Sequence, residues 1–173
     1  MKRGRALYLW ECELFRFING QFERKKWNSF FHFCTHLGSA SFTIAVTLGF
    51  LCLSLFSSSN IGFEMATALF LSHLPVATIK KIYPRKRPYL VLPESKVMEN
   101  PLHDHSFPSG HTTAIFSIVT PLILYLPILA IILVPLAIFV GTSRVFLGLH
   151  YPSDVLAGAC LGSATGLLSV FMI

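Results

Sequence analysis

The sequence predicts an all-α integral membrane protein: a helical bundle of about five transmembrane helices, preceded by an N-terminal interfacial amphipathic helical segment. Of its 173 residues, 53% are hydrophobic and only 13% are charged, which is too apolar for a soluble domain of this size. The charged residues are also clumped, because no Asp, Glu, Lys or Arg occurs in residues 27–63, 105–143 or 155–173. A transmembrane helix needs about 20 apolar residues. Each charge-free tract therefore has room for one or two spans.

Residues 1–35 are predicted to lie in the membrane interface rather than to cross the membrane. Apolar residues recur at helical spacing in the first half of this segment: Leu7, Trp10, Leu14, Phe17 and Ile18. Charged residues such as Glu11 and Arg16 interrupt any continuous apolar run. The following stretch FERKKWNSFFHF combines basic and aromatic side chains, which is typical of an anchor at headgroup level. The acidic residues and the lack of a small-residue cleavage site argue against a cleaved signal peptide.

Turn-forming residues divide the remaining chain into five predicted spans. The boundaries are marked by the SSSN turn at residues 57–60, the proline-containing loop 81–108 and Pro127. The spans are expected at residues 37–57, 63–80, 110–126, 128–146 and 152–173. Residues 1–173 then form a single domain, in which residues 36–173 are the transmembrane catalytic core.

The last predicted span carries a glycine stripe. Gly158, Gly162 and Gly166 recur at four-residue spacing, so they share one face of a helix. Small residues in this register let two helix backbones approach closely inside a membrane. We therefore expect this face to pack tightly against another span.

Three polar groups stand at the ends of predicted spans: Lys80 with Arg87-Pro88, Ser109-Gly110-His111, and Ser143-Arg144 with His150 and Asp154. In the five-span scheme all three groups lie on the same side of the membrane. The loop 81–108 joins spans two and three, and spans three and four return the chain to the same face. Ionisable residues at membrane depth are costly and usually mark function.

These residue types are suited to binding a phosphoryl group. Lys80, Arg87 and Arg144 are cations, and a guanidinium group matches the oxygen atoms of a phosphate. Ser109 and Gly110 open the third span, where free backbone N–H groups and the positive end of the helix dipole favour an anion. The cluster therefore predicts a phosphate-binding site.

Two histidines, His111 and His150, can share the chemistry of phosphoryl transfer. One imidazole attacks phosphorus while the other protonates the leaving oxygen. Asp154 lies four residues after His150 and can accept a hydrogen bond from one ring nitrogen, which presents the other nitrogen to phosphorus. We therefore expect His150 to be the nucleophile and His111 the acid.

The spacing of these residues resembles the three-part signature of the type 2 phosphatidic acid phosphatase family, relatives of the vanadium haloperoxidases. Its parts here are Lys80-x6-Arg87-Pro88, Pro108-Ser109-Gly110-His111 and Ser143-Arg144-x5-His150-x3-Asp154. The resemblance covers about residues 63–173 and implies a metal-independent lipid phosphatase without cofactors that forms a phosphohistidine on His150. Family members commonly have six spans, so this chain would lack the first. Within the family it most resembles small bacterial lipid phosphatases, of the lipid A 1-phosphatase or phosphatidylglycerophosphate phosphatase type.

The predicted function is hydrolysis of a phosphomonoester or pyrophosphate on a lipid headgroup. The expected partners are the membrane and a phospholipid or lipid A substrate, and no nucleic acid. Two alternatives stay open: a lipid phosphotransferase that uses the same phosphohistidine, and an undecaprenyl pyrophosphate phosphatase. A non-catalytic lipid-binding or transport protein is disfavoured because His111, His150 and Asp154 are all present.

The four cysteines and the remaining histidines do not predict a metal site. The cysteines are far apart and form no C-x-x-C pair: Cys12, Cys34, Cys52 and Cys160. The HDH stretch at residues 103–105 lacks a third partner and predicts a substrate-facing loop. His32, His36 and His73 are expected to be structural. For Lys81, Arg85 and Lys86, a topogenic cluster and a functional role stay equally open.

Two features of the sequence point to opposite membrane orientations. In the five-span scheme every Lys and Arg lies on the active-site face, and the positive-inside rule would make that face cytoplasmic. The family resemblance instead implies the periplasmic surface of a bacterial inner membrane. Phosphate binding accounts for Lys80, Arg87 and Arg144, so their charges are poor reporters of topology. We therefore expect the active site in the periplasm and the C-terminus in the cytoplasm.

Overall fold

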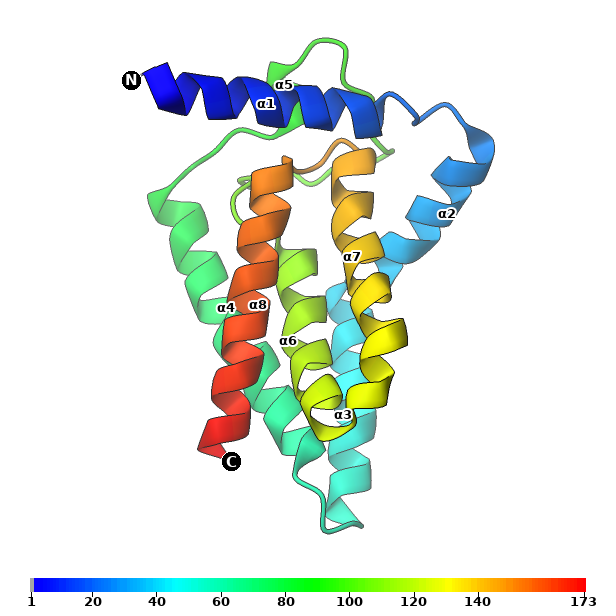
Figure 1. Ribbon diagram of the computed structural model, residues 1–173, viewed down its shortest axis with the longest axis vertical. Helices are drawn as coiled ribbons and strands as arrows, with labels where there is room; N and C mark the ends of the chain where they lie inside the picture. The colour runs from blue at the N-terminus through cyan, green and yellow to red at the C-terminus, as the bar shows by residue number, and fades with distance from the viewer. Residues whose placement is uncertain (1) are drawn as a thin grey trace.

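The structure, a computed structural model, describes residues 2–173, with side chains from residue 6 onward. Its elements are α1 (Lys2–Asn19), α2 (Lys25–His36), α3 (Ala40–Leu55), α4 (Ile61–Ile82), α5 (Pro88–Val91), α6 (Gly110–Tyr125), the 3-10 helix η1 (Pro127–Leu129), α7 (Ala130–Phe146) and α8 (Pro152–Met172). Figure 1 shows α3, α4, α6, α7 and α8 as an upright bundle, with α1 lying across one end. The predicted all-α membrane bundle is confirmed.

Among the described residues, three helices are long and apolar enough to cross a membrane: α4, η1 with α7, and α8. Helices α2 and α3 meet the same criterion as a pair that is bent by 49°. Helix α6 is a shorter apolar helix of 16 residues. The sequence places residues 1–35 in the interfacial segment, whereas the structure forms α2 from Lys25 to His36 and packs it against α7. The first predicted span is therefore extended at its start by a bent helix.

The chain topology gathers the N-terminus and the connections that carry the polar groups at one end of the bundle. In Figure 1 the α4–α6 loop and the α7–α8 connection lie at the α1 end, while the α3–α4 turn, the α6–α7 turn and the C-terminus lie at the other. This is the arrangement that the five-span scheme predicts. The side chains of Lys2, Arg3 and Arg5, which the scheme counts on the same face, lie outside the described side chains.

Helix α1 buries one face on the bundle and exposes the other. Cys12, Phe15 and Asn19 are buried, and α1 contacts both α7 and α8. The Asn19 side chain donates to the carbonyl oxygens of Lys96 and Phe146 at 2.8 Å, which ties the helix to the α4–α6 loop and to α7. Four of the five predicted apolar residues are exposed by 48–73%: Leu7, Trp10, Leu14 and Phe17. The fifth, Ile18, is half-buried and packs against the core. An exposed apolar stripe suits a helix that lies in the membrane interface.

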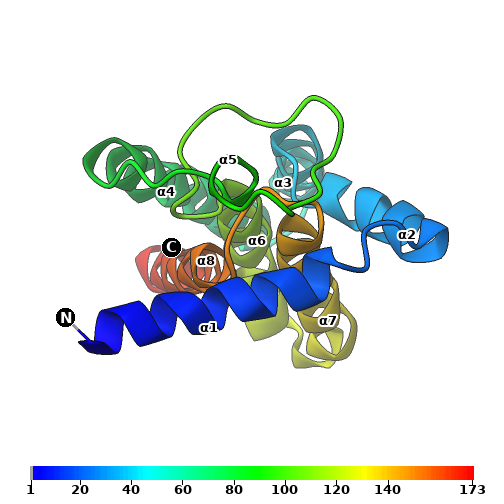
Figure 2. The same ribbon diagram turned by 90° about the horizontal axis from the view of Figure 1, so that it is seen from above.

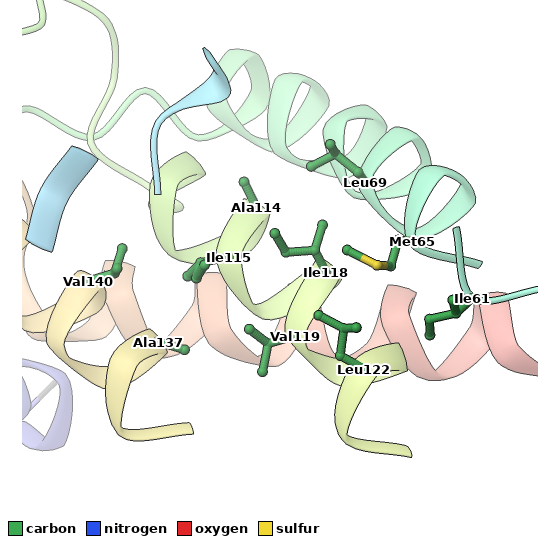
Figure 3. Close-up of a cluster of buried hydrophobic side chains, with 10 residues drawn as sticks. All are labelled: Ile61, Met65, Leu69, Ala114, Ile115, Ile118, Val119, Leu122, Ala137 and Val140. Carbon is green, nitrogen blue, oxygen red and sulfur yellow. The ribbon is translucent and has the colours of Figure 1, made fainter. Parts of the chain in front are cut away.

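The middle of the bundle is an apolar core shared by α4, α6 and α7. Figure 3 shows Met65 and Leu69 of α4 meeting Ile118 of α6, with Ala137 and Val140 of α7 on the other side of α6. These side chains are almost completely buried. The core holds the helices that present the polar groups at the α1 end.

Helix α8 packs against α6 through the predicted glycine stripe. A Cβ atom at Gly162 would lie 2.4 Å from the carbonyl oxygen of Thr113, and one at Gly158 would lie 2.7 Å from that of Ser109. No side chain fits at such distances, so the two backbones are in direct contact. This contact holds the start of α6 beside the start of α8, where the polar groups meet.

Candidate active site

The predicted site residues come from several elements and meet at the α1 end of the bundle. Lys80 is in the last turn of α4, and Arg87 immediately precedes α5. Ser109, Gly110 and His111 form the start of α6. The last three lie around the α7–α8 connection: Arg144, His150 and Asp154. Figure 2, the view from above, shows α1 passing over this end beside α8 and α7, with the α4–α6 loop over the rest.

His150 lies between a cation and a carboxylate. Its side chain is buried, with Nε2 at 3.2 Å from Nη1 of Arg87 and Nδ1 at 3.7 Å from Oδ2 of Asp154. The ring therefore turns Nδ1 toward the carboxylate and Nε2 toward the predicted phosphate-binding cations. The separation from Asp154 is longer than a hydrogen bond. Ser106 Oγ lies 3.5 Å from Nδ1 and donates to the same Asp154 oxygen. The hydrogen bond that the sequence predicts from His150 to Asp154 is therefore made by Ser106 instead.

The protonation state of His150 fits a nucleophile. Burial lowers the pKa of His150 to about 4; the Asp154 carboxylate acts against this shift, and the positive charges of Arg87 and Arg144 add to it. The ring is thus neutral at neutral pH, with a free lone pair on one nitrogen. A nucleophilic imidazole needs this form.

Lys80 and Arg87 share one carboxylate, that of Asp104. Lys80 Nζ and Arg87 Nη2 both donate to it. Burial opposes ionisation of Asp104, but the hydrogen bonds from these two cations prevail and lower its pKa to about 2. Arg87 is also held by the carbonyl oxygens of Asp104 and Leu149, each at 2.8 Å. An anionic group of the protein therefore sits on two of the three cations predicted to bind phosphate.

Arg144 carries a buried hydrogen-bond donor without a partner. Its side chain is 2% exposed, and Nη1 donates to the hydroxyl of Thr35 at the end of α2. Nε is buried and has no partner among the described residues. An unsatisfied buried donor on a charged group is costly, and an anion would satisfy it. This orphaned donor favours Arg144 as a phosphate-binding residue.

The start of α6 offers donors to an anion. Ser109 is the N-cap, and its hydroxyl accepts from Thr112 Oγ1 at 2.9 Å, which leaves its own hydrogen free to donate. A Cβ atom at Gly110 would meet no protein atom within 4 Å, so there is open space beside the first turn. Free N–H groups at a helix start bind phosphates. His111 follows directly and is half-buried.

The break between α2 and α3 also borders the site. A Cβ atom at Gly38 would lie 3.0 Å from the carbonyl oxygen of His111 and 2.5 Å from Val140. Together with Thr35, this places the bend of the first span against His111 and Arg144. The bent helix pair thus forms one wall of the candidate site.

Four contacts of the site were not predicted: those of Asp104, Ser106, Arg85 and Thr35. Ser106 stands two residues before the Pro-Ser-Gly-His motif, which was its only signal. Arg85 forms an ion pair with Asp154. The sequence left two roles equally open for Arg85, a topogenic charge or a functional residue, and this contact favours the second. Nothing in the sequence marks Thr35, because its importance comes only from packing.

The structure also describes the other candidate metal ligands. The four cysteines are free, with Cys12 and Cys34 buried and Cys52 and Cys160 exposed. Across residues 6–173, no group of three or more His, Cys, Asp or Glu side chains is placed to hold a metal ion. Asp104, in the HDH stretch, instead pairs with Lys80 and Arg87.

Known proteins share this sequence and this fold. Residues 61–173 match the PAP2 superfamily. A lipid A 1-phosphatase of Rhizobium etli is 32% identical over 118 residues, which are 66% of this chain and 51% of that protein, so the match spans about half the length of that relative. An undecaprenyl-diphosphatase of Sulfolobus acidocaldarius is 31% identical over 162 residues, covering 91% of this chain and 76% of that protein.

A solved structure extends the likeness to three dimensions. The crystal structure of Aquifex aeolicus LpxE matches with a TM-score of 0.81 at 31% identity, covering 92% of this chain and 94% of that one. The family match covers more than half of the chain and contains every residue of the three-part signature. The chain therefore belongs to the PAP2 superfamily.

Proposed function

We propose that this protein is a membrane phosphatase that hydrolyses a phosphate ester or pyrophosphate of a lipid headgroup through a phosphohistidine on His150. The observation that carries the proposal is the position of His150. Its Nε2 atom faces Arg87 at 3.2 Å, while Nδ1 faces Asp154. A neutral imidazole held in this way directs its nucleophilic nitrogen at a group bound by the neighbouring cations.

The proposed reaction has two steps. His150 Nε2 attacks phosphorus and the bond from phosphorus to the lipid oxygen breaks, while His111 donates a proton to the departing oxygen. Water then attacks phosphorus and gives up a proton to His111, the phosphorus–nitrogen bond breaks, and inorganic phosphate leaves. Lys80, Arg87, Arg144 and the start of α6 stabilise the phosphoryl oxygens as negative charge redistributes.

The chain's own cations support a mechanism without a metal ion. Three basic side chains converge on the site, and the buried Nε of Arg144 lacks a partner among the described residues. Positive charge from guanidinium and ammonium groups can take the electrostatic role that a metal ion has in other phosphatases. We therefore infer that catalysis needs no metal and no cofactor.

The substrate is proposed as lipid A 1-phosphate or phosphatidylglycerophosphate. The first of these is supported by the match to the Rhizobium etli lipid A 1-phosphatase. Undecaprenyl diphosphate is a second candidate, supported by the longer match to the Sulfolobus acidocaldarius undecaprenyl-diphosphatase, which covers 91% of this chain. A lipid phosphotransferase is an outcome that the experiment below distinguishes.

We further propose a location in a bacterial inner membrane, with the active site on the periplasmic surface. The exposed apolar stripe of α1 supports an active site at the membrane surface, because α1 lies across the same end of the bundle as the α7–α8 connection (Figure 1), and this connection contains His150. At that level the headgroup of a lipid can reach the site while its chains stay in the bilayer.

The decisive experiment measures phosphate release by the purified protein in detergent from the three candidate lipids and from phosphatidic acid. We expect release from at least one lipid, inhibition by vanadate, which resembles the five-coordinate transition state, and full activity in a chelator. Transfer to a second lipid without free phosphate would indicate a phosphotransferase. An absolute requirement for added magnesium would overturn metal independence. No release or transfer with any lipid would overturn the proposed function for these substrates.

A further inference from the structure

Arg85 connects the catalytic end of α8 to the interfacial helix α1. Its Nη1 atom donates to Asp154 Oδ1 and to Ser153 Oγ, both at 2.7 Å. Its Nη2 atom donates to Glu11 of α1. The guanidinium carbon lies 4.0 Å from the centre of the Tyr151 ring, a cation–π contact. One side chain therefore bridges two carboxylates from elements at opposite ends of the chain.

The charges in this bridge depend on one another. Ser153 Oγ donates to the second carboxylate oxygen of Glu11, which closes a ring of contacts with Arg85. The Arg85 and Glu11 side chains are each 17% exposed, and that of Asp154 is completely buried. Burial disfavours the charged form of Arg85, but Asp154 and Glu11 prevail and raise its pKa. Removing one member leaves the others as poorly compensated charges.

Arg85 acts on the side of Asp154 that does not face His150. The other carboxylate oxygen, Oδ2, is the one nearest to His150, and it accepts from Ser106 Oγ and from the Tyr151 backbone N–H. With both oxygens engaged, the carboxylate has a fixed orientation. The phosphate-binding cation Arg87 lies on the far side of the His150 ring, at Nε2. Arg85 is thus placed to orient the catalytic pair and not to bind substrate.

We propose that Arg85 is a positioning residue for the His150–Asp154 pair, and that Glu11 of the interfacial helix α1 holds Arg85 in place. The inference rests on the proposed function, because it assigns a task to Asp154 within that reaction. It also makes α1 a part of the catalytic apparatus. The seating of α1 on the bundle then sets the geometry of the nucleophile.

The bridge has an electrostatic consequence that a packing role would not have. The charged and titratable groups that face His150 are Arg87, His111, Arg144 and Asp154. Those around the Arg85 bridge are Tyr8, Glu11, Cys12, Tyr151 and Asp154. Losing the positive charge of Arg85 leaves the Asp154 carboxylate uncompensated, which raises the pKa of His150. Losing the negative charge of Glu11 leaves the positive charge of Arg85 less compensated, which lowers the pKa of His150. The two substitutions therefore shift the same group in opposite directions.

The test compares Arg85→Met, Arg85→Lys and Glu11→Gln with Glu13→Gln. The last is a matched control, because Glu13 lies on the same helix, is exposed and has no ion-pair partner among the described residues. The first readout is the pKa of His150. It is measured by an NMR titration of histidine-labelled protein in detergent, and the His150 signal is assigned by its absence in His150→Ala. We expect a rise of about one unit for Arg85→Met, a smaller fall for Glu11→Gln and no shift for Glu13→Gln. This readout does not depend on turnover.

The second readout is phosphate release from the substrate that the wild-type protein uses. We expect kcat to fall by about tenfold to a hundredfold for Arg85→Met, since small misplacements of reacting groups cost this much, while KM stays nearly constant. Arg85→Lys keeps the charge and should recover part of kcat. A raised KM at unchanged kcat would identify Arg85 as a substrate-binding residue and overturn the proposal.

The inference and the proposed function fail in different ways. If wild-type protein releases no phosphate but the His150 pKa shifts as described, the proposed function is wrong and the coupling stands. If the protein is active but both Arg85→Met and Glu11→Gln keep the wild-type His150 pKa and kcat, the coupling is wrong. Should Arg85→Met fail to fold, Glu11→Gln and Arg85→Lys decide, and wild-type behaviour of both overturns the proposal.

Discussion

The guanidinium group of Arg87 lies against the imidazole of His150, with Nη1 at 3.2 Å from Nε2. Arg87 is held there by two backbone carbonyl oxygens, those of Asp104 and Leu149. The cation is therefore fixed by the main chain and does not rely on substrate for its position. A preorganised donor of this kind is already aimed at the charge that develops in the transition state.

Each of three single substitutions, His150→Ala, His111→Ala and Arg144→Ala, should remove nearly all phosphatase activity. Each variant should still insert into the membrane. The three losses should not add in a triple variant, because the residues serve one reaction. Phosphate release and membrane fractionation measure the two properties. His73→Ala is the control, since His73 is exposed on α4, and it should keep wild-type activity. Turnover above a few per cent in His150→Ala would contradict its role as nucleophile.

Asp104→Asn should increase the affinity of the site for anions. The carboxylate of Asp104 pairs with Lys80 and Arg87, so a substrate phosphate must compete with it for these cations. The backbone contacts of Arg87 do not depend on this carboxylate, and the asparagine is close in shape. We expect the inhibition constant for vanadate to fall by several-fold, measured by steady-state kinetics. An unchanged or higher constant would show that the carboxylate organises the cations and does not compete with the ligand.

Gly110→Ala should weaken phosphate binding without destabilising the fold. A Cβ atom there meets no protein atom within 4 Å, so it projects into the space expected for the phosphate. We expect a higher KM at an unchanged melting temperature. Gly49→Ala on α3 is a matched control, because its Cβ atom also meets nothing within 4 Å, and it should leave KM unchanged. A wild-type KM for Gly110→Ala would place the phosphate elsewhere.

The C-terminus and loop 81–108 should lie on opposite sides of the membrane, with the loop in the periplasm. The structure places them at opposite ends of the bundle (Figure 1). A fluorescent protein that folds only in the cytoplasm should fluoresce when fused after Ile173, and alkaline phosphatase fused there should be inactive. In a cysteine-free background, Glu99→Cys should react with an impermeant thiol reagent from outside. The reverse pattern would mean that the positive-inside rule holds for this chain.

The membrane class, the span order and the signature residues were determined by the sequence alone. Charge-free tracts and turn-forming residues are local features, and a helix that crosses a bilayer must satisfy its backbone internally, so length and hydropathy are sufficient to place it. The glycine stripe of α8 likewise required only helical periodicity. The structure brings the signature residues together at one end because the odd and even spans alternate in direction.

Only the tertiary structure decided which groups the signature residues contact. These contacts pair residues from different elements: Asp104 with Lys80 and Arg87, Thr35 with Arg144, and Arg85 with Glu11 and Asp154. The contacts of Thr35 and of Arg85 join residues at least 69 positions apart. Neither composition nor spacing specifies such partners, because they follow from how the helices pack. The bend between α2 and α3 likewise depends on tertiary packing, because Gly38 lies in close contact with His111 and Val140. The nature of a side chain thus predicts its chemistry, but burial and neighbours decide which oxygen or nitrogen it meets.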